Sequence, residues 1–302
     1  MMPRPKTADA TCVEPPARVE ELLMTERTIV ITGASDGIGA AAARALAAAG
    51  DRIIVVGRSP QRTEAIAAEL GADHFIADFG RLAEVRTLAA ELLQRYPRID
   101  VLANNAGGIL GDREVTVDGH EKTFQVNHLA PFLLTTLLMD RLLASRATVI
   151  NTSSAANRFG HIDLDDLEND RKYSPNNAYG DAKLANILFT KELHRRYGAR
   201  GLVTAAFHPG VVATSFATGS TSVMRLVYQT ALKRMLITPE KGADTLIWLA
   251  STAAGVDWQS GEFYEKRRVR ATNRQATDAG LATALWERSI DMVAADLFPQ
   301  GD

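Results

Sequence analysis

The sequence predicts an α/β fold with a single doubly wound domain, in which a parallel seven-stranded sheet carries helices on both faces. Short runs of β-branched and apolar residues alternate with alanine- and leucine-rich segments from residue 27 onward. The runs 28–31 (TIVI) and 53–56 (IIVV) are apolar at every position, which is typical of parallel strands buried on both sides. Ligands of such sheets bind at the carboxyl ends of the strands.

The predicted elements alternate along this region. Strands are expected at residues 28–31, 53–56, 74–78, 100–104, 147–153, 202–210 and 261–265. Helices are expected at residues 38–49, 63–70, 82–96, 117–144, 177–198 and 240–251. Gly50 and Gly71 stop the first two helices, Pro97 closes the third, and Pro131 is expected to bend the long fourth helix.

The chain is expected to contain one folded domain, residues 25–302, after a flexible tail at residues 1–24 that holds four prolines. Met24 is a candidate start residue because the first strand follows it closely. The segments 157–177 and 215–237 are long connections, which are often functional in compact domains. Segment 215–237 follows the sixth strand and mixes apolar with basic residues, so it is predicted to be a lid that closes on substrate.

Composition narrows the possible partners and the compartment. The formal net charge of −2 points to neither a nucleic acid nor a membrane surface, and no apolar run is long enough to cross a membrane. The single cysteine, Cys12, excludes an intrachain disulfide and fits a cytoplasmic location. The histidines lack metal-ligand spacing, so no metal is expected. A small molecule is the expected partner.

A glycine-rich turn, TGASDGIG, joins the first strand to the first helix. Glycines let the backbone turn sharply and approach a pyrophosphate, while the helix N-terminus supplies N–H donors. An ordinary strand-to-helix turn is the alternative, but the position after the first strand favours a Rossmann-type dinucleotide site. The candidate cofactor-binding residues here are Gly33, Ser35, Asp36, Gly37, Ile38 and Gly39.

The end of the second strand bears on which dinucleotide binds. An acid at this point would take the ribose 2′-hydroxyl, whereas an arginine accommodates a 2′-phosphate. Arg58 stands there without an acid, and Arg62 follows one helical turn later. NADP(H) is therefore the preferred cofactor. NAD(H) stays possible, because Arg58 could face solvent and because Asp36 would repel a 2′-phosphate.

Tyr179 and Lys183 are spaced i, i+4 on a predicted helix, so their side chains leave the same face. A nearby ammonium lowers the pKa of a tyrosine and lets it exchange a proton with a carbinol oxygen. The pair alone could equally be a surface tyrosine and a solvated lysine. Further polar residues favour catalysis: Asn104 and Ser154 end the fourth and fifth strands, and Asn127 lies in the helix between them.

The motifs TGASDGIG, NNAG, FQVNHLAP, SSAA, YGDAK and HPGVVAT resemble, in order, those of the short-chain dehydrogenase/reductase family over about residues 26–292. The resemblance implies that Ser154 polarises the substrate oxygen, Tyr179 exchanges the proton, and Lys183 tunes Tyr179 and holds the nicotinamide ribose. It also implies that Asn127 supports a proton relay. It implies further cofactor contacts from Asp78, Phe79, Asn104, Ala106, Gly107, Pro209, Gly210, Val212 and Thr214.

Tyr179 stands 25 positions after Ser154, a long gap that resembles the retinol-dehydrogenase-like subgroup, which includes the WW-domain-containing oxidoreductase. That likeness implies NADP(H) and a lipophilic or bulky alcohol or carbonyl substrate, and the wider family suggests a homodimer. His208, before Pro209, could border the nicotinamide or simply support the backbone turn. Two other functions are considered: a non-catalytic dinucleotide-binding regulator, and a nucleotide-sugar epimerase or dehydratase. The complete Tyr–Lys set weighs against the regulator.

Overall fold

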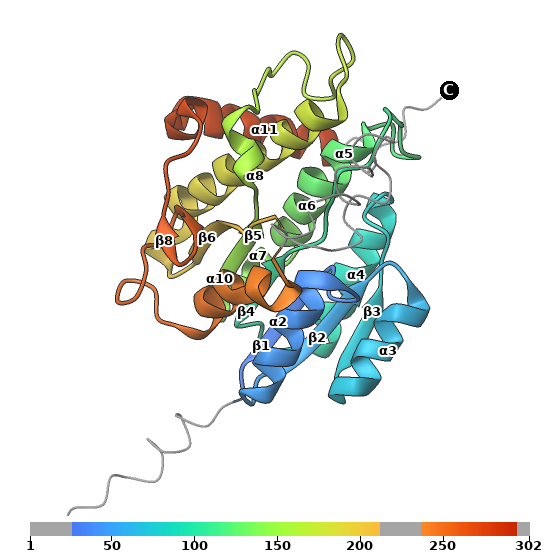
Figure 1. Cartoon of the computed structure of the whole chain (residues 1–302), viewed down its shortest axis with the longest axis vertical. Helices are drawn as coiled ribbons and strands as arrows, with labels where there is room; N and C mark the ends of the chain where they lie inside the picture. Colours follow the sequence, from blue (N-terminus) through green and yellow to red (C-terminus); the bar gives the residue numbers. More distant parts are fainter. Residues whose placement is uncertain (1–25, 212–236, 295–302) are drawn as a thin grey trace, which may run out of the picture.

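The strands form one sheet in the order β3-β2-β1-β4-β5-β6-β7-β8 (Figure 1). The computed structural model describes residues 26–211 and 237–294, and this part of the chain holds the strands and helices of the fold as described. The strands are β1 (Thr28–Thr32), β2 (Arg52–Gly57), β3 (Asp73–Ile76), β4 (Val101–Asn104), β5 (Thr148–Thr152), β6 (Val203–His208), β7 (Glu262–Glu265) and β8 (Arg268–Val269). The chain order reverses at β1, which lies between β2 and β4.

The doubly wound α/β fold is confirmed, with one correction to the sheet. Seven strands, β1 to β7, pair in parallel as predicted, and an eighth, β8, pairs antiparallel with β7. The extra strand is a two-residue edge formed where the chain turns back after Glu265. Lys266 and Arg267 both have positive φ in that turn, and their polar sequence gave no strand signal.

Two layers of helices cover the sheet. One face carries α2 (Gly37–Ala48), α3 (Pro60–Leu70) and α10 (Pro239–Ser251), and α2 and α10 lie side by side in Figure 1. The other face carries α4 (Leu82–Arg95), α6 (Ala130–Leu137), α7 (Met139–Ala144) and α8 (Pro175–Tyr197), with α11 (Ala279–Ala294) packed on α8. Short turns complete the described chain: α5 (Lys122–Phe124), η1 (Gln125–Leu129), η2 (Ala155–Arg158), η3 (Gly198–Arg200) and η6 (Arg274–Thr277).

Strand alternation divides the core between these layers. Ile29 and Ile31 face the helices α2 and α10, whereas Val30 belongs to the cluster beneath α4 and α6. Because every position of β1 is buried, the strand needs apolar residues on both sides, as its sequence shows. The sheet thereby holds the carboxyl ends of β1, β4, β5 and β6 at one edge.

The predicted long helix 117–144 is wrong in its start and its continuity. Residues 117–121 are not helical, and the helical stretch begins at Lys122, after Glu121 accepts hydrogen bonds from the backbone N–H groups of Thr123 and Phe124. A π-helical turn, η1, interrupts it at Gln125–Leu129, just before Pro131. The predicted tail, residues 1–24, and nearly all of the predicted lid, residues 215–237, lie outside the described residues.

Candidate active site

The glycine turn opens a cavity of about 720 Å³ at the carboxyl ends of the strands. Gly33 and Gly37 have φ of +66° and +55°, a region that favours glycine. Gly39 is a packing residue: an added Cβ would lie 2.4 Å from the Gly33 carbonyl oxygen and 2.7 Å from Asn105 Nδ2. The helix can therefore begin close to the strand. Of the predicted turn residues, Gly33, Ser35, Asp36, Gly37 and Ile38 line the cavity, and Gly39 lies beneath it.

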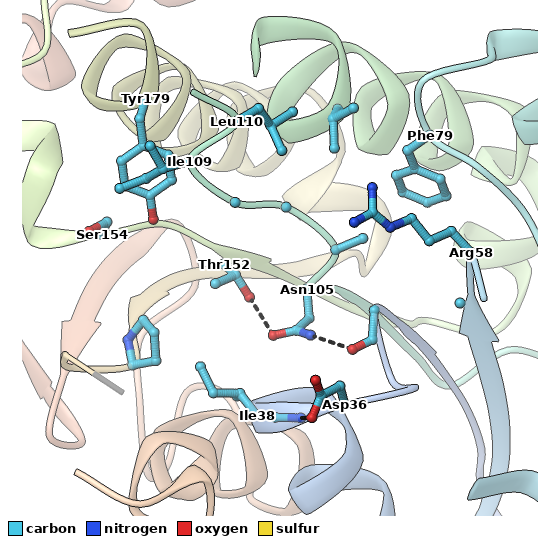
Figure 2. A pocket seen from close by; sticks show the side chains of 18 of the residues that line it. Asp36, Ile38, Arg58, Phe79, Asn105, Ile109, Leu110, Thr152, Ser154 and Tyr179 are labelled. Atoms are coloured by element: carbon cyan, nitrogen blue, oxygen red, sulfur yellow. Dashed lines mark hydrogen bonds between the residues drawn. The ribbon is translucent and has the colours of Figure 1, made fainter. Parts of the chain in front are cut away.

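Two arginine side chains lie at the end of the cavity that is next to the carboxyl end of β2. Arg58 and Arg62 both line it, and Figure 2 shows the Arg58 guanidinium reaching toward the cavity near Phe79. Arg62 Nη1 lies 3.3 Å from Asp36 Oδ2, so the two charges offset one another. The repulsion that Asp36 would exert on a phosphate is thereby reduced. Arg58 has no ion pair among the described residues.

The residues after β3 and β4 form the next part of the wall. Asp78 and Phe79 line the cavity as predicted, and Asp78 Oδ1 accepts a hydrogen bond from the Gly80 N–H at 2.9 Å. Ala106 and Gly107 also line it. A Cβ on Gly107 would lie 2.4 Å from Asn127 Oδ1, so only glycine fits without movement there.

Asn104 does not reach the cavity, contrary to the sequence expectation. It is buried, and its Nδ2 donates to Thr135 Oγ1 and Asn151 Oδ1, each at 2.9 Å. Asn104 is the last residue of β4, and successive side chains of a strand point in opposite directions. Asn105, one residue on, lines the cavity instead, and its Nδ2 donates to the Thr32 carbonyl at 3.0 Å. Its Oδ1 accepts from Thr152 Oγ1 at 3.4 Å (Figure 2).

Ser154 and Tyr179 come together on one wall. Both line the cavity, and Figure 2 shows the hydroxyl end of Tyr179 beside Ser154. The helix α8 runs back along the sheet after β5, so its first turns lie at the carboxyl ends of the strands. Tyr179 lies near the start of this helix and therefore reaches the cavity. The choice of Ser154 over its neighbour agrees with the geometry: Ser153 is fully buried and donates from Oγ to the Lys183 carbonyl at 2.7 Å.

Lys183 lies behind Tyr179 rather than on the cavity surface. Its Nζ is 5.3 Å from the centre of the Tyr179 ring and donates to the Thr152 carbonyl at 3.1 Å. The side chain is 1% exposed, and this burial lowers the pKa of Lys183 from 10.5 to about 7. The Lys183 amine can therefore exchange a proton near neutral pH.

Asn127 lies in the π-helical turn η1, below the cavity. Its Nδ2 donates to the Gly108 and Thr123 carbonyls at 2.9 and 2.8 Å, and its Oδ1 accepts from the Gly108 N–H. Its own carbonyl accepts from Asn186 Nδ2 at 3.0 Å. Asn127 therefore fixes the loop at Gly107 and Gly108, and its side chain does not line the cavity. A single π-turn inside a helix often marks a functional position.

Several lining residues were not predicted. Apolar side chains form one section of the wall: Ile109, Leu110, Val126, Phe159 and Val211. Asn176, which was not predicted either, also lines the cavity. So do His208, which one of its two interpretations placed at the nicotinamide, and Pro209 and Gly210. Ile109 stacks close to Tyr179 in Figure 2. The adjacent apolar pair Ile109 and Leu110, shortly after NNAG, was the available sequence signal for this wall. Val212 and Thr214 lie outside the described residues.

The burial of Lys183 predicts a pH-dependent stability. Its pKa is lower in the folded than in the unfolded chain, so between pH 7 and 10 the unfolded chain holds the extra proton and stability rises with pH. Relative to Lys183→Met, the wild-type free energy of unfolding should increase by about 2 kcal/mol from pH 7 to pH 9. Urea unfolding at each pH measures this. Lys191→Met, on the same helix but partly exposed, should show no such difference.

In the part of the chain that the structure describes, none of the helices combines the length and the apolar character that a membrane span requires. Within the same residues, no cluster of three or more His, Cys, Asp or Glu side chains is arranged to hold a metal ion.

The strand order, the glycine turn and the Ser–Tyr–Lys arrangement define a doubly wound oxidoreductase of the dinucleotide-binding class. Residues 27–225 match the short chain dehydrogenase family, and the chain belongs to it. A Streptomyces sp. (strain C5) protein assigned as the daunorubicin C-13 ketoreductase DnrU is 44% identical over 88% of this chain and 92% of its own. Human retinol dehydrogenase 13 is 36% identical over 89% and 85%, which agrees with the predicted subgroup.

Solved structures agree with the fold. A Mycobacterium paratuberculosis protein superposes with a TM-score of 0.72 at 34% identity, covering 89% of this chain and 94% of that one. A short chain dehydrogenase of Shigella flexneri, solved in complex with NADP, gives a TM-score of 0.62 at 27% identity, covering 80% and 97%. The protein is therefore an oxidoreductase that interconverts alcohols and carbonyl compounds with a nicotinamide cofactor.

Proposed function

We propose that the protein is an NADP(H)-dependent reductase of bulky, lipophilic ketones or aldehydes, with Tyr179 as the general acid and base. One observation carries the proposal: Ser154 and Tyr179 meet at one cavity wall with buried Lys183 directly behind them. A tyrosine alone is a weak acid–base group at neutral pH. A cation held behind its ring stabilises the tyrosinate and makes proton exchange feasible.

The cavity fits a dinucleotide. Positive φ at Gly33 and Gly37 turns the backbone beneath the place of a pyrophosphate, and the N-terminus of α2 points its N–H groups toward that place. When bound, the cofactor supplies or accepts the hydride. The cavity-lining residues proposed to hold it are Gly33, Ser35, Asp36, Gly37, Ile38, Arg58, Asp78, Phe79, Asn105, Ala106, Gly107, Pro209 and Gly210. Gly39 supports the turn, and Lys183, whose Nζ lies 3.2 Å from the place of a Cβ on Gly107, is proposed to support the ribose from behind that glycine.

The chain's own residues perform the proton steps. The Ser154 hydroxyl donates a hydrogen bond to the substrate carbonyl and orients it. Tyr179 delivers the phenolic proton to the same oxygen as the alcohol forms, and takes it back in the reverse direction. Lys183 stabilises the tyrosinate left behind. Asn127 holds the loop at Gly107 and Gly108, which fixes the floor on which the reacting groups lie.

Two features support the cofactor and substrate preferences. Arg58 lines the end of the cavity where a 2′-phosphate would be accommodated, and Arg62 offsets the charge of Asp36. The solved relative with bound NADP points the same way. Ile109, Leu110 and Phe159 give the open part of the cavity an apolar wall, which favours a substrate with a large apolar body.

A ketone panel graded in apolar bulk tests this proposal. Purified protein is mixed with NADPH or NADH and each ketone, and loss of cofactor absorbance is compared with alcohol formed. We expect equimolar alcohol, faster turnover with NADPH, and higher kcat/KM for aryl ketones than for acetone. Tight NADPH binding without turnover of any carbonyl or alcohol would instead favour a dinucleotide-binding regulator.

A further inference from the structure

His208 is a buried side chain in the cavity wall that the proposed mechanism does not use. Within β6, Ala205 and Phe207 pack toward α2 and α10, whereas Ala206 packs toward α8. Because strand side chains alternate, His208 points to the α8 side, the side from which Tyr179 comes. It is 8% exposed and lines the cavity.

A hydrogen bond between β6 and α8 shows how far along the sheet His208 lies relative to Tyr179. Thr204 Oγ1 donates to the Thr190 carbonyl at 3.0 Å, which aligns β6 with α8 at that point. His208 lies four residues, about 13 Å, further toward the carboxyl end of β6. Tyr179 lies eleven residues, about 16 Å, from Thr190 toward the start of α8, in the same direction. The two side chains therefore reach nearly the same level.

The adjacent strand places Ser154 beside them. The Ser153 N–H donates to the Phe207 carbonyl at 2.8 Å and Thr152 pairs with Phe207, so His208 lies opposite Ser153, one residue before Ser154. Neighbouring strands are about 4.8 Å apart. His208 thus lies on the strand next to the serine that is proposed to bind the reacting oxygen, one residue before its level.

One nitrogen of the imidazole lacks a hydrogen-bond partner among the described residues. Nδ1 of His208 is buried, and no donor or acceptor among the described residues reaches it. Burial is the main cause that lowers the pKa of His208, with Arg158 and Lys266 adding to it and Glu265 opposing it, so the ring is neutral at physiological pH. A neutral imidazole carries one donor and one acceptor. Leaving a buried polar atom unsatisfied is costly, and a ligand group can remove that cost.

We propose that His208 is a specificity-determining residue that hydrogen-bonds a second oxygen of the substrate, on the carbon next to the reacting carbonyl. This rests on the proposed function. The preferred substrates are then α-hydroxy ketones or 1,2-dicarbonyl compounds with an apolar body. Ser154 and Tyr179 hold the reacting oxygen, and the imidazole one strand away receives its neighbour. A hydroxyl or a carbonyl fits, because the neutral ring can accept or donate.

Matched ketones test the proposal. Wild type, His208→Leu and His208→Asn are compared on acetophenone and 2-hydroxyacetophenone with NADPH. We expect the wild type to favour the hydroxy ketone in kcat/KM by about tenfold, chiefly through KM. His208→Leu should lose that preference, and His208→Asn, which restores a donor and an acceptor, should recover part of it. His74→Leu, an exposed histidine on β3, should keep the wild-type ratio.

Two measurements separate the possible failures. The dissociation constant of NADPH should be the same for wild type and His208→Leu; a rise together with an unchanged ketone ratio would assign the imidazole to the cofactor and overturn the proposal. If the wild type reduces neither ketone, the proposed function fails for this class. Calorimetry then still measures whether the protein loaded with NADP⁺ binds 2-hydroxyacetophenone more tightly than acetophenone. Equal affinities for the two ketones would overturn the role of His208.

Discussion

Tyr179→Phe is expected to lower kcat by about 10³-fold while leaving the dissociation constant of NADPH within about twofold of wild type. The substitution removes only the phenolic oxygen. The ring packs against Ile109 and Ala156, and phenylalanine keeps those contacts, so the wall of the cavity should hold its shape. What is lost is the group that exchanges a proton with the substrate oxygen. Lys183, behind the ring, cannot replace it, because its side chain does not line the cavity.

Initial rates of NADPH consumption on the best ketone of the panel measure this effect, and quenching of protein fluorescence by NADPH measures binding. Tyr197→Phe is the matched control, because it makes the same change at the other end of the same helix, where the ring packs on Trp286. We expect its kcat to equal that of the wild type. If Tyr179→Phe kept more than about a tenth of wild-type kcat, the proton would have another donor and the assignment of Tyr179 would be wrong.

The architecture could be predicted because its signals are local. Buried parallel strands need apolar residues at every position, and β1 and β2 show this directly. The Tyr179–Lys183 pair follows from helical spacing alone, and the structure places Lys183 Nζ behind the tyrosine ring. These features depend on neighbouring residues in the chain, so one sequence is enough to find them.

Features that depend on the direction of a side chain at the end of an element were missed. Whether Asn104 or Asn105 faces the cavity is decided by a single step of strand alternation, and the pattern NNAG does not show where β4 ends. The role of Asn127 follows from the π-turn at Gln125–Leu129, which has no clear sequence signal. The sequence did not decide whether His208 borders the nicotinamide or supports the turn, because its burial depends on contacts distant in sequence.

One omission could have been avoided. Helix α11 was not predicted, although its buried positions recur with helical spacing: Ala282, Leu285, Trp286, Ser289 and Val293. Trp286 packs on Phe132 and Phe189, so this helix completes the core that supports α8 from outside. Ten of the sixteen residues of this helix are apolar, so both the composition and the period were available in the sequence. Tyr179 therefore depends on a distant segment for the rigidity of its own helix.

Arg58→Asp is expected to reverse the cofactor preference. At the end of β2, an arginine can bind a 2′-phosphate through charge-assisted hydrogen bonds, whereas an acid accepts hydrogen bonds from the free ribose hydroxyl. The substitution removes the attraction between Arg58 and the 2′-phosphate, and it adds repulsion between the new carboxylate and that phosphate. We expect kcat/KM for NADPH to fall by about 10²-fold, and kcat/KM for NADH to stay constant or rise. Because Arg58 is exposed, the loss should shrink as salt is added.

Arg62 is not expected to compensate for the loss of the Arg58 charge. The charge of Arg62 is already offset by Asp36. In Arg58→Asp, Arg62 therefore cannot fully restore the attraction to a 2′-phosphate. Steady-state rates with each cofactor, at low and high ionic strength, give the preference. Arg288→Asp, the same charge reversal on the exposed side of α11, should leave both values unchanged. An unaltered NADPH-to-NADH ratio in Arg58→Asp would mean that the 2′-phosphate does not lie at the end of β2, and that the cation there serves another part of the ligand.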